Sequence, residues 1–270
     1  MALRRKKLVR LGHNQDEKYH SDSVMDDNGD IHFAFLEHLI DNDYEIKYAK
    51  YDGESWSVST PDPIPITGAL LGHISIGVDS LNNPKIVFMA GNSETGNQQM
   101  KYAEYNSEFE FWNLEIISSG DYSSLSLAID SNDVPHISYR HDTSIDTLEY
   151  RTKPSNVWNM EIVTTDTGSG EIVGRFSSIA VDSNNLARIA AEAYNGIKIF
   201  EAPGWTTINI GGMDEFVDLK IDSNDENHVI WMNNGGINYY STFVNSHTVT
   251  PEWNYANRKI SLALDNNNIP

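Results

Sequence analysis

The sequence predicts an all-β chain assembled from repeated four-stranded units, and three observations carry this prediction. A phrase centred on an aspartate recurs along the chain at intervals of 40 to 53 residues. Each interval contains four short runs of β-branched and aromatic residues, separated by clusters of Asn, Asp, Gly and Ser, as expected for strands and hairpins. Repeats of this length with four antiparallel strands are typical of a β-propeller. The repeated aspartates are Asp26, Asp79, Asp130, Asp182, Asp222 and Asp265.

The third copy shows the four strands most clearly, at residues 125–130, 136–140, 147–151 and 157–163. The apolar spacing of residues 33–40 would also suit a short helix, but the repeat register predicts a strand there. We therefore expect a single propeller domain over residues 1–270 with almost no helix. Its blade units lie at about 21–66, 73–119, 124–166, 176–211 and 215–258, followed by a partial sixth unit at 259–270.

The two ends of the chain bear on how the ring closes. The sixth copy reaches Pro270 after its first strand, whereas the matching position of the third copy leads directly into a second strand. This predicts five full repeats plus the start of a sixth, and indicates a fragment of a longer protein. Residues 260–265 and residues 8–11 could each add a strand to the last blade. A complete five-bladed ring with a leftover strand is the competing interpretation.

Composition narrows the class of protein. With 39% apolar and 21% charged residues the chain is globular, and no apolar run is long enough to span a membrane. A net charge of −20 disfavours nucleic acid and anionic membranes as partners. The absence of cysteine excludes disulfides and thiolate chemistry. No apolar stretch follows the basic N-terminal residues, so no signal peptide is predicted in this sequence.

The most specific polar pattern is a basic or imidazole side chain six residues after each of the first five repeated aspartates. The two positions flank a tight connection between the first and second strands, so they can face each other across the hairpin. We interpret the pairs as structural staples of the turn; a functional ring of Asp and His on one face is the alternative. The basic positions are His32, Lys85, His136, Arg188 and His228.

Two further groups are candidates for chemistry. Asp26, Asn28 and Asp30 alternate carboxylate and amide oxygens as a calcium loop does, although no bidentate Glu follows at the twelfth position. This is the weak calcium candidate; otherwise no metal and no cofactor is predicted. Because loops carry function on a rigid scaffold, the departure of one blade from its siblings marks a binding site. The predicted binding residues are Tyr139, Arg140, His141 and Asp142, with the long loop at 91–98 as a second departure.

The repeat phrase at residues 126–139, with Leu148, Tyr150 and Trp158 after it, resembles repeats of uncharacterised bacterial and archaeal propellers grouped with the sialidase-like, BNR-type proteins. The resemblance covers residues 21–270 and implies the propeller fold. It does not imply sialidase activity, because the nearest match to the family's Asp box, at residues 164–171, lacks the aromatic residue. No catalytic residue is carried over.

These observations favour a non-catalytic recognition or adhesion propeller, located outside the cell or on its surface, with carbohydrate as one class of ligand. Sugars would stack on exposed aromatic rings and hydrogen-bond to Asp and Asn side chains. Two alternatives stay open. The first is a scaffold for protein partners, and the second is a glycoside hydrolase or lyase built at one end of the propeller axis. Fold alone does not choose among them.

Overall fold

The computed structural model describes residues 21–39, 43–67, 73–91, 98–166, 173–194, 196–211, 215–233, 236–242, 247–248, 260–265, 268 and 270. Over these residues the chain is all-β, with one 3₁₀ turn at Pro154–Asn156. No described helix is long and apolar enough to cross a membrane. The expected strand of residues 8–11 and most of the loop at 91–98 lie outside the described residues.

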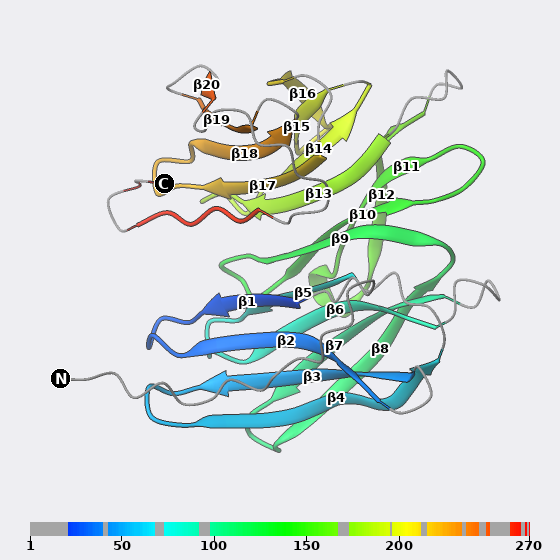
Figure 1. Cartoon of the computed structure of the whole chain (residues 1–270), viewed down its shortest axis with the longest axis vertical. Helices are drawn as coiled ribbons and strands as arrows, with labels where there is room; N and C mark the ends of the chain where they lie inside the picture. The colour runs from blue at the N-terminus through cyan, green and yellow to red at the C-terminus, as the bar shows by residue number, and fades with distance from the viewer. Residues whose placement is uncertain are drawn as a thin grey trace.

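Five four-stranded antiparallel sheets follow one another along the chain, and in each the strands pair in sequence order (Figure 1). This confirms the expected repeat, including a strand rather than a helix after residue 31. The first sheet comprises β1 (Ser21–Met25), β2 (Ile31–His38), β3 (Asp43–Tyr51) and β4 (Trp56–Thr67). The second comprises β5 (Ile74–Val78), β6 (Pro84–Ala90), β7 (Gln99–Asn106) and β8 (Phe111–Ser119).

The remaining three sheets repeat the same order. The third comprises β9 (Tyr122–Ile129), β10 (Pro135–His141), β11 (Thr147–Thr152) and β12 (Asn159–Thr165). The fourth comprises β13 (Val173–Val181), β14 (Ala187–Ala193), β15 (Ile197–Glu201) and β16 (Thr206–Asn209). The fifth comprises β17 (Glu215–Ile221), β18 (Asn227–Asn233), β19 (Gly236–Ser241) and β20 (His247–Thr248).

The first strands of consecutive sheets, β1, β5, β9, β13 and β17, lie side by side and form the inner wall of the assembly. Residues 260–265 continue this wall beyond β17, because the Leu262 amide donates to Oδ2 of Asp218 at 2.7 Å. They pair with no strand among the described residues. The apolar core lies between sheets, in clusters that each combine side chains of two neighbours.

One side-chain ladder ties the inner strands together at every junction. The residue four before each repeated aspartate accepts a hydrogen bond from a backbone amide of the next sheet, as Ser75 does from Leu127 at 3.1 Å. The equivalent bonds join Asp22 to Ile76, Ser126 to Ile179, Ser178 to Leu219 and Asp218 to Leu262, at 2.7–3.2 Å.

Two positions before the repeated aspartate, the second, third and fourth sheets have a small residue, Gly77, Ala128 and Ala180, and Gly77 shows a packing cause. A Cβ added to Gly77 would lie 2.7 Å from Cγ1 of Ile129 on the next sheet. Ile129, one position before Asp130, therefore packs directly over Gly77 of the preceding sheet. Lys220 breaks the pattern; its ammonium lies 3.7 Å from Oδ1 of Asp218.

Candidate functional site

The repeated aspartates close the turns between first and second strands. Oδ1 of Asp130 accepts hydrogen bonds from the amides of Asn132 and Val134, both at 2.8 Å, while Oδ2 lies 3.3 Å from Nε2 of His136. Nδ1 of the same imidazole lies 2.6 Å from the Tyr150 hydroxyl. A carboxylate only accepts, so Nε2 carries the proton and Nδ1 accepts from tyrosine.

The side chain at the basic position determines which partners it takes. The three imidazoles each contact a tyrosine of the third strand: His32 with Tyr48, His136 with Tyr150 and His228 with Tyr239, at 2.6–2.7 Å. Lysine and arginine have no acceptor, and they contact a glutamate instead. Lys85 lies 2.6 Å from Glu104, and Arg188 lies 3.7 Å from Glu201. Each also donates to a carbonyl in the next turn, of Asp133 and Asp225. In all five sheets, the aspartate and the basic side chain are thus held by contacts with their own sheet and, for Lys85 and Arg188, with the next turn.

In the calcium candidate, the carboxylates of Asp26 and Asp30 already contact amides and basic side chains of the protein. Oδ1 of Asp26 accepts the amides of Asn28 and Asp30, both at 2.9 Å, and Oδ2 faces His32. The ammonium of Lys50 lies 2.9 Å from Oδ2 of Asp30. No group of three His, Cys, Asp or Glu side chains that could hold a metal is present among the described residues.

The predicted binding cluster of the third sheet divides into a buried and a surface part. Tyr139 is completely buried, so it is not available to a ligand. Its hydroxyl donates to Glu149 at 2.5 Å and accepts from Nε of Arg151 at 2.7 Å. Burial, followed by the hydrogen bond to Glu149, raises the pKa of the Tyr139 hydroxyl well above its ordinary value. Nδ1 of His141 lies 3.0 Å from Oε1 of the same Glu149.

The two remaining members of the cluster pair within the hairpin between β10 and β11. Arg140 forms ion pairs with Asp142 at 2.7 Å and with Asp146 at 2.5 Å.

Burial alone would raise the pKa of the Glu149 carboxyl, but hydrogen bonds from Tyr139, His141 and Thr147 outweigh it and hold that pKa below its usual range. Of the four predicted residues, His141 and Asp142 are the most open, with about a third of each side chain exposed.

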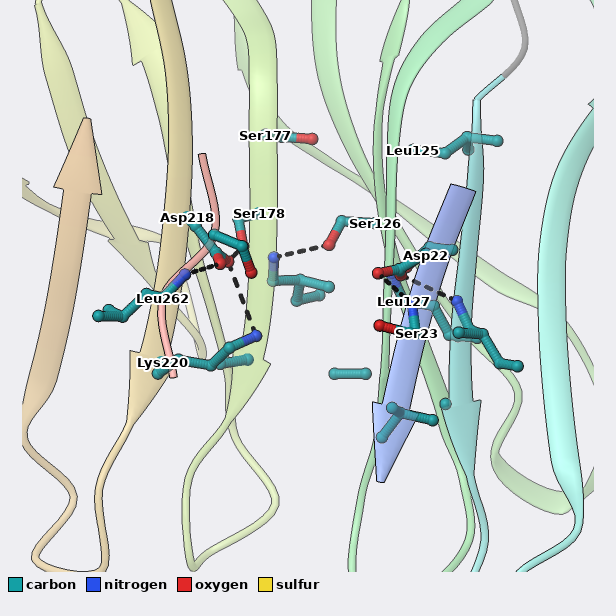
Figure 2. Close-up of a pocket in the computed structure, with 18 of the residues that line it drawn as sticks. Asp22, Ser23, Leu125, Ser126, Leu127, Ser177, Ser178, Asp218, Lys220 and Leu262 are labelled. Atoms are coloured by element: carbon teal, nitrogen blue, oxygen red, sulfur yellow. Dashed lines mark hydrogen bonds and ion pairs between the residues drawn. The ribbon is translucent and has the colours of Figure 1, made fainter. Parts of the chain in front are cut away.

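A channel of about 900 Å³ runs between the inner strands and is lined mainly by them (Figure 2). At one end are the hairpin turns, where a smaller pocket of about 340 Å³ is lined by Asp130, Asp182 and Asp222 with neighbouring serines. The other end lies where the inner strands begin, near Ser177 and Leu125 in Figure 2. The two ends of the channel differ. At the turn end the carboxylates are hydrogen-bonded to protein groups, whereas the opposite end carries aromatic rings.

At that opposite end, three consecutive inner strands carry a residue in the left-handed backbone region, six positions before the repeated aspartate. The residues are Ser124, Phe176 and Phe216, with φ of 55–56°. The pairing register shifts at or beside these positions, as in a β-bulge. Left-handed backbone is costly for side chains with a Cβ and is concentrated at functional sites.

The bulged residues contact one another across sheets. The Phe176 amide donates to Oγ of Ser124 at 2.9 Å, and the Phe176 and Phe216 rings lie 4.6 Å apart between centroids. The Arg175 guanidinium lies 5.1 Å from the centre of the Phe176 ring and is held by the buried Glu192, at 2.8 Å from Nε. Both rings are half-buried and line the channel. We call Phe176, Phe216 and Arg175 the mouth site.

The mouth site and the predicted cluster lie at the same end of neighbouring sheets. A Cβ added to Gly174, next to Arg175, would lie 3.4 Å from Cβ of Arg140. The sequence could have indicated the mouth site, because Phe176 and Phe216 stand where the third copy has Ser124. The left-handed backbone that orients them has no signature in residue types alone.

No protein-family model matches the sequence, and a search of curated proteins finds no match. Solved structures do match. AofleA from Arthrobotrys oligospora aligns with a TM-score of 0.62 and 12% identity over 94% of this chain and 77% of that one. The fungal Aleuria aurantia lectin, a six-bladed β-propeller that recognises fucose, gives 0.57 and 12% over 83% and 74%. An α-L-arabinanase of Penicillium chrysogenum gives 0.57 and 9% over 82% and 77%.

Identities this low show the fold alone, and the fold is that of a β-propeller. Nothing in these matches singles out the sialidase-like group within propellers, so the expected resemblance holds at the level of fold only. The matched proteins include a lectin and a glycoside hydrolase.

Proposed function

We propose that the protein is a non-catalytic carbohydrate-binding propeller that acts outside the cell, with the mouth site as its sugar-binding surface. The observation that carries the proposal is the Phe176–Phe216 ring pair, fixed by left-handed backbone on adjacent inner strands at the open end of the channel. Ligand sites of this kind combine apolar and aromatic walls with a few placed polar groups. Arg175 supplies such a group here, with 37% of its side chain exposed.

The charge of the chain agrees with an uncharged ligand. At net −20 the protein repels anions at long range, and the Arg175 charge is compensated by Glu192. A neutral sugar can present a C–H face to the rings and hydroxyls to the polar rim. The lectin and the arabinanase that share the fold support carbohydrate as the ligand class.

A glycan array probed with the purified protein, with calcium and again with a chelator, tests this function. We expect selective binding that Phe176→Ala and Phe216→Ala each weaken at least tenfold, a loss of about 1.4 kcal/mol. Phe109→Ala is the matched control, because Phe109 is a 66% exposed phenylalanine in a different hairpin. If Phe109→Ala weakens binding as much as the mouth-site variants do, the assignment of the mouth site is wrong. No glycan binding in either condition would favour the protein-scaffold alternative.

A glycoside hydrolase is the second candidate, because the mouth adjoins two buried carboxylates on neighbouring sheets, Glu149 and Glu192. Both are engaged, by His141 and Arg175, whereas glycosidases need one carboxyl to donate a proton and one to attack or activate water. Release of reducing ends from polysaccharides, abolished by Glu192→Gln, would establish the enzyme. We expect no release.

A further inference from the structure

One face of the first sheet differs from the corresponding face of the second, third and fourth sheets. Strand pairing aligns Met25 with Ile31, Ile31 with Tyr51, and Tyr51 with Trp56, so these four residues form one row on one face. Val58 lies on the same face, two residues beyond Trp56. Met25 is 69% exposed, Val58 60% and Trp56 39%. We call these five residues the first-sheet patch.

The equivalent tryptophans of later sheets are covered by the preceding sheet. Trp158 packs edge-on against Tyr102, with ring centroids 5.3 Å apart, and its indole N–H donates to Glu115 at 3.0 Å. Trp112 and Trp205 repeat both contacts, with Tyr48 and Ser59 and with Tyr150 and Glu161. Trp56 instead contacts Tyr51 of its own sheet, at 5.1 Å between centroids. The first-sheet patch is thus the uncovered member of a repeated interface.

The first sheet also lacks the residues through which later sheets contact the sheet before them. Three positions before its aspartate stands Ser23, where later copies have Ile or Leu. From the third turn on, an Asn or Asp accepts from a serine of the preceding turn, as Asp133 does from Ser80 at 2.6 and 2.7 Å. Gly29 occupies that position in the first turn and has no side chain to accept with. The patch therefore suits an apolar partner that binds without the inner-strand and turn contacts that join consecutive sheets.

We propose that two copies of this chain associate face to face through the first-sheet patch, about a two-fold axis. The patch contains no charged side chain, whereas the chain as a whole carries −20. The charged residues of the same face, Glu37, Glu45 and Lys47, lie at the opposite end of β2 and β3 and pair with one another. Two copies repel each other over most of their surfaces, and the repulsion is least where no carboxylate faces its twin. A two-fold axis brings a patch against itself, so an uncharged, apolar and aromatic patch is self-complementary. Burying Trp56, Val58 and Met25 supplies the driving force.

The association goes beyond the proposed sugar binding and does not depend on it. If both hold, a dimer presents two mouth sites and gains avidity on a multivalent glycan surface. Array binding and dimerisation are measured separately, so either can fail alone.

Sedimentation velocity of the full chain over a dilution series tests the proposal. We expect a species of twice the 30.4 kDa chain mass that dissociates on dilution. Trp56→Glu combined with Val58→Glu should leave only monomer at every concentration. The matched control is Met160→Glu combined with Ile162→Glu, since these β12 residues are 47% and 52% exposed. The control should dimerise like the parent, and circular dichroism should show all three folded.

A thiol readout locates the interface, because the chain contains no cysteine. Under mild oxidation Val58→Cys should form a covalent dimer and Ile162→Cys should not. A parent that stays monomeric at all concentrations overturns the proposal. So does a dimer that survives the Trp56 and Val58 substitutions, or one that crosslinks through position 162 and not 58.

Discussion

Nε2 of His32 lies 3.1 Å from Oδ2 of Asp26, and both side chains are completely buried. Burial lowers the pKa of His32, and the hydrogen bond with Asp26 offsets this only in part. Burial works to raise the pKa of Asp26, but hydrogen bonds from His32, Asp30 and Asn28 hold it below its ordinary value. The pair is thus a neutral imidazole beside an ionised carboxylate.

This charge state predicts acid sensitivity. A histidine whose pKa is lower in the folded state binds its proton more readily when unfolded, so stability is fully present above about pH 6.5 and falls as the pH drops below it. His136 has a lowered pKa for the same first cause, burial. We expect the urea midpoint of the parent to fall between pH 7 and pH 5, and the slope to be smaller for His32→Gln. His136→Gln should reduce the slope in the same way.

The aspartate staple and the predicted binding cluster are expected to differ in their effect on stability. Asp130→Ala removes an acceptor from two turn amides and from His136, leaving the part-buried Val134 amide and the buried His136 imidazole without this partner at a cost of about 2–4 kcal/mol. Arg140→Ala and His141→Ala remove partly exposed pairs and should cost about 1 kcal/mol or less. Equilibrium unfolding in urea measures all three. Equal losses would mean that the Asp130 turn is not a structural staple.

Loss of the hydroxyl is expected to affect stability differently at two equivalent tyrosines, Tyr102 and Tyr150. The Tyr102 hydroxyl is buried without a hydrogen-bond partner among the described residues, and the basic position of its sheet holds Lys85, which cannot accept. The Tyr150 hydroxyl contacts Nδ1 of His136. Tyr150→Phe should cost about 1 kcal/mol, while Tyr102→Phe should be neutral or stabilising. A comparable loss for both variants in thermal unfolding would show that Tyr102 has a partner.

The sequence predicted the fold through features that repeat because the packing repeats. The register of Asp130 and His136 placed every inner hairpin, since one turn chemistry serves all five. Strand limits were less accurate: β9 begins at Tyr122, three residues before the expected start, because a bulge at Ser124 lets pairing resume beyond it. Periodicity cannot anticipate an irregularity of that kind.

The candidate site was harder to predict than the fold. Tyr139, Arg140, His141 and Asp142 were selected by residue type, but strand alternation turns Tyr139 into the core between the second and third sheets. Which polar groups remain open depends on partners from other strands, such as Glu149 and Asp146. Phe176 and Phe216 differ in residue type from Ser124 of the third copy, but the left-handed backbone at all three positions has no signature in the sequence.

The junction between the second and third sheets allows a direct test of packing across blades. Gly77→Ala places a Cβ 2.7 Å from Cγ1 of Ile129, closer than carbon atoms approach, so a backbone or side chain must move. We expect a loss of about 1–3 kcal/mol, typical of overpacking. Ile129→Ala removes apolar contacts of a partly buried side chain and should also destabilise, but it removes the atom that the added Cβ at position 77 would meet. The double variant should therefore be less destabilised than the sum of the two, with a coupling of about 1 kcal/mol or more in urea unfolding. Strict additivity would mean that the small residues of the inner strands have a cause other than contact with the next sheet.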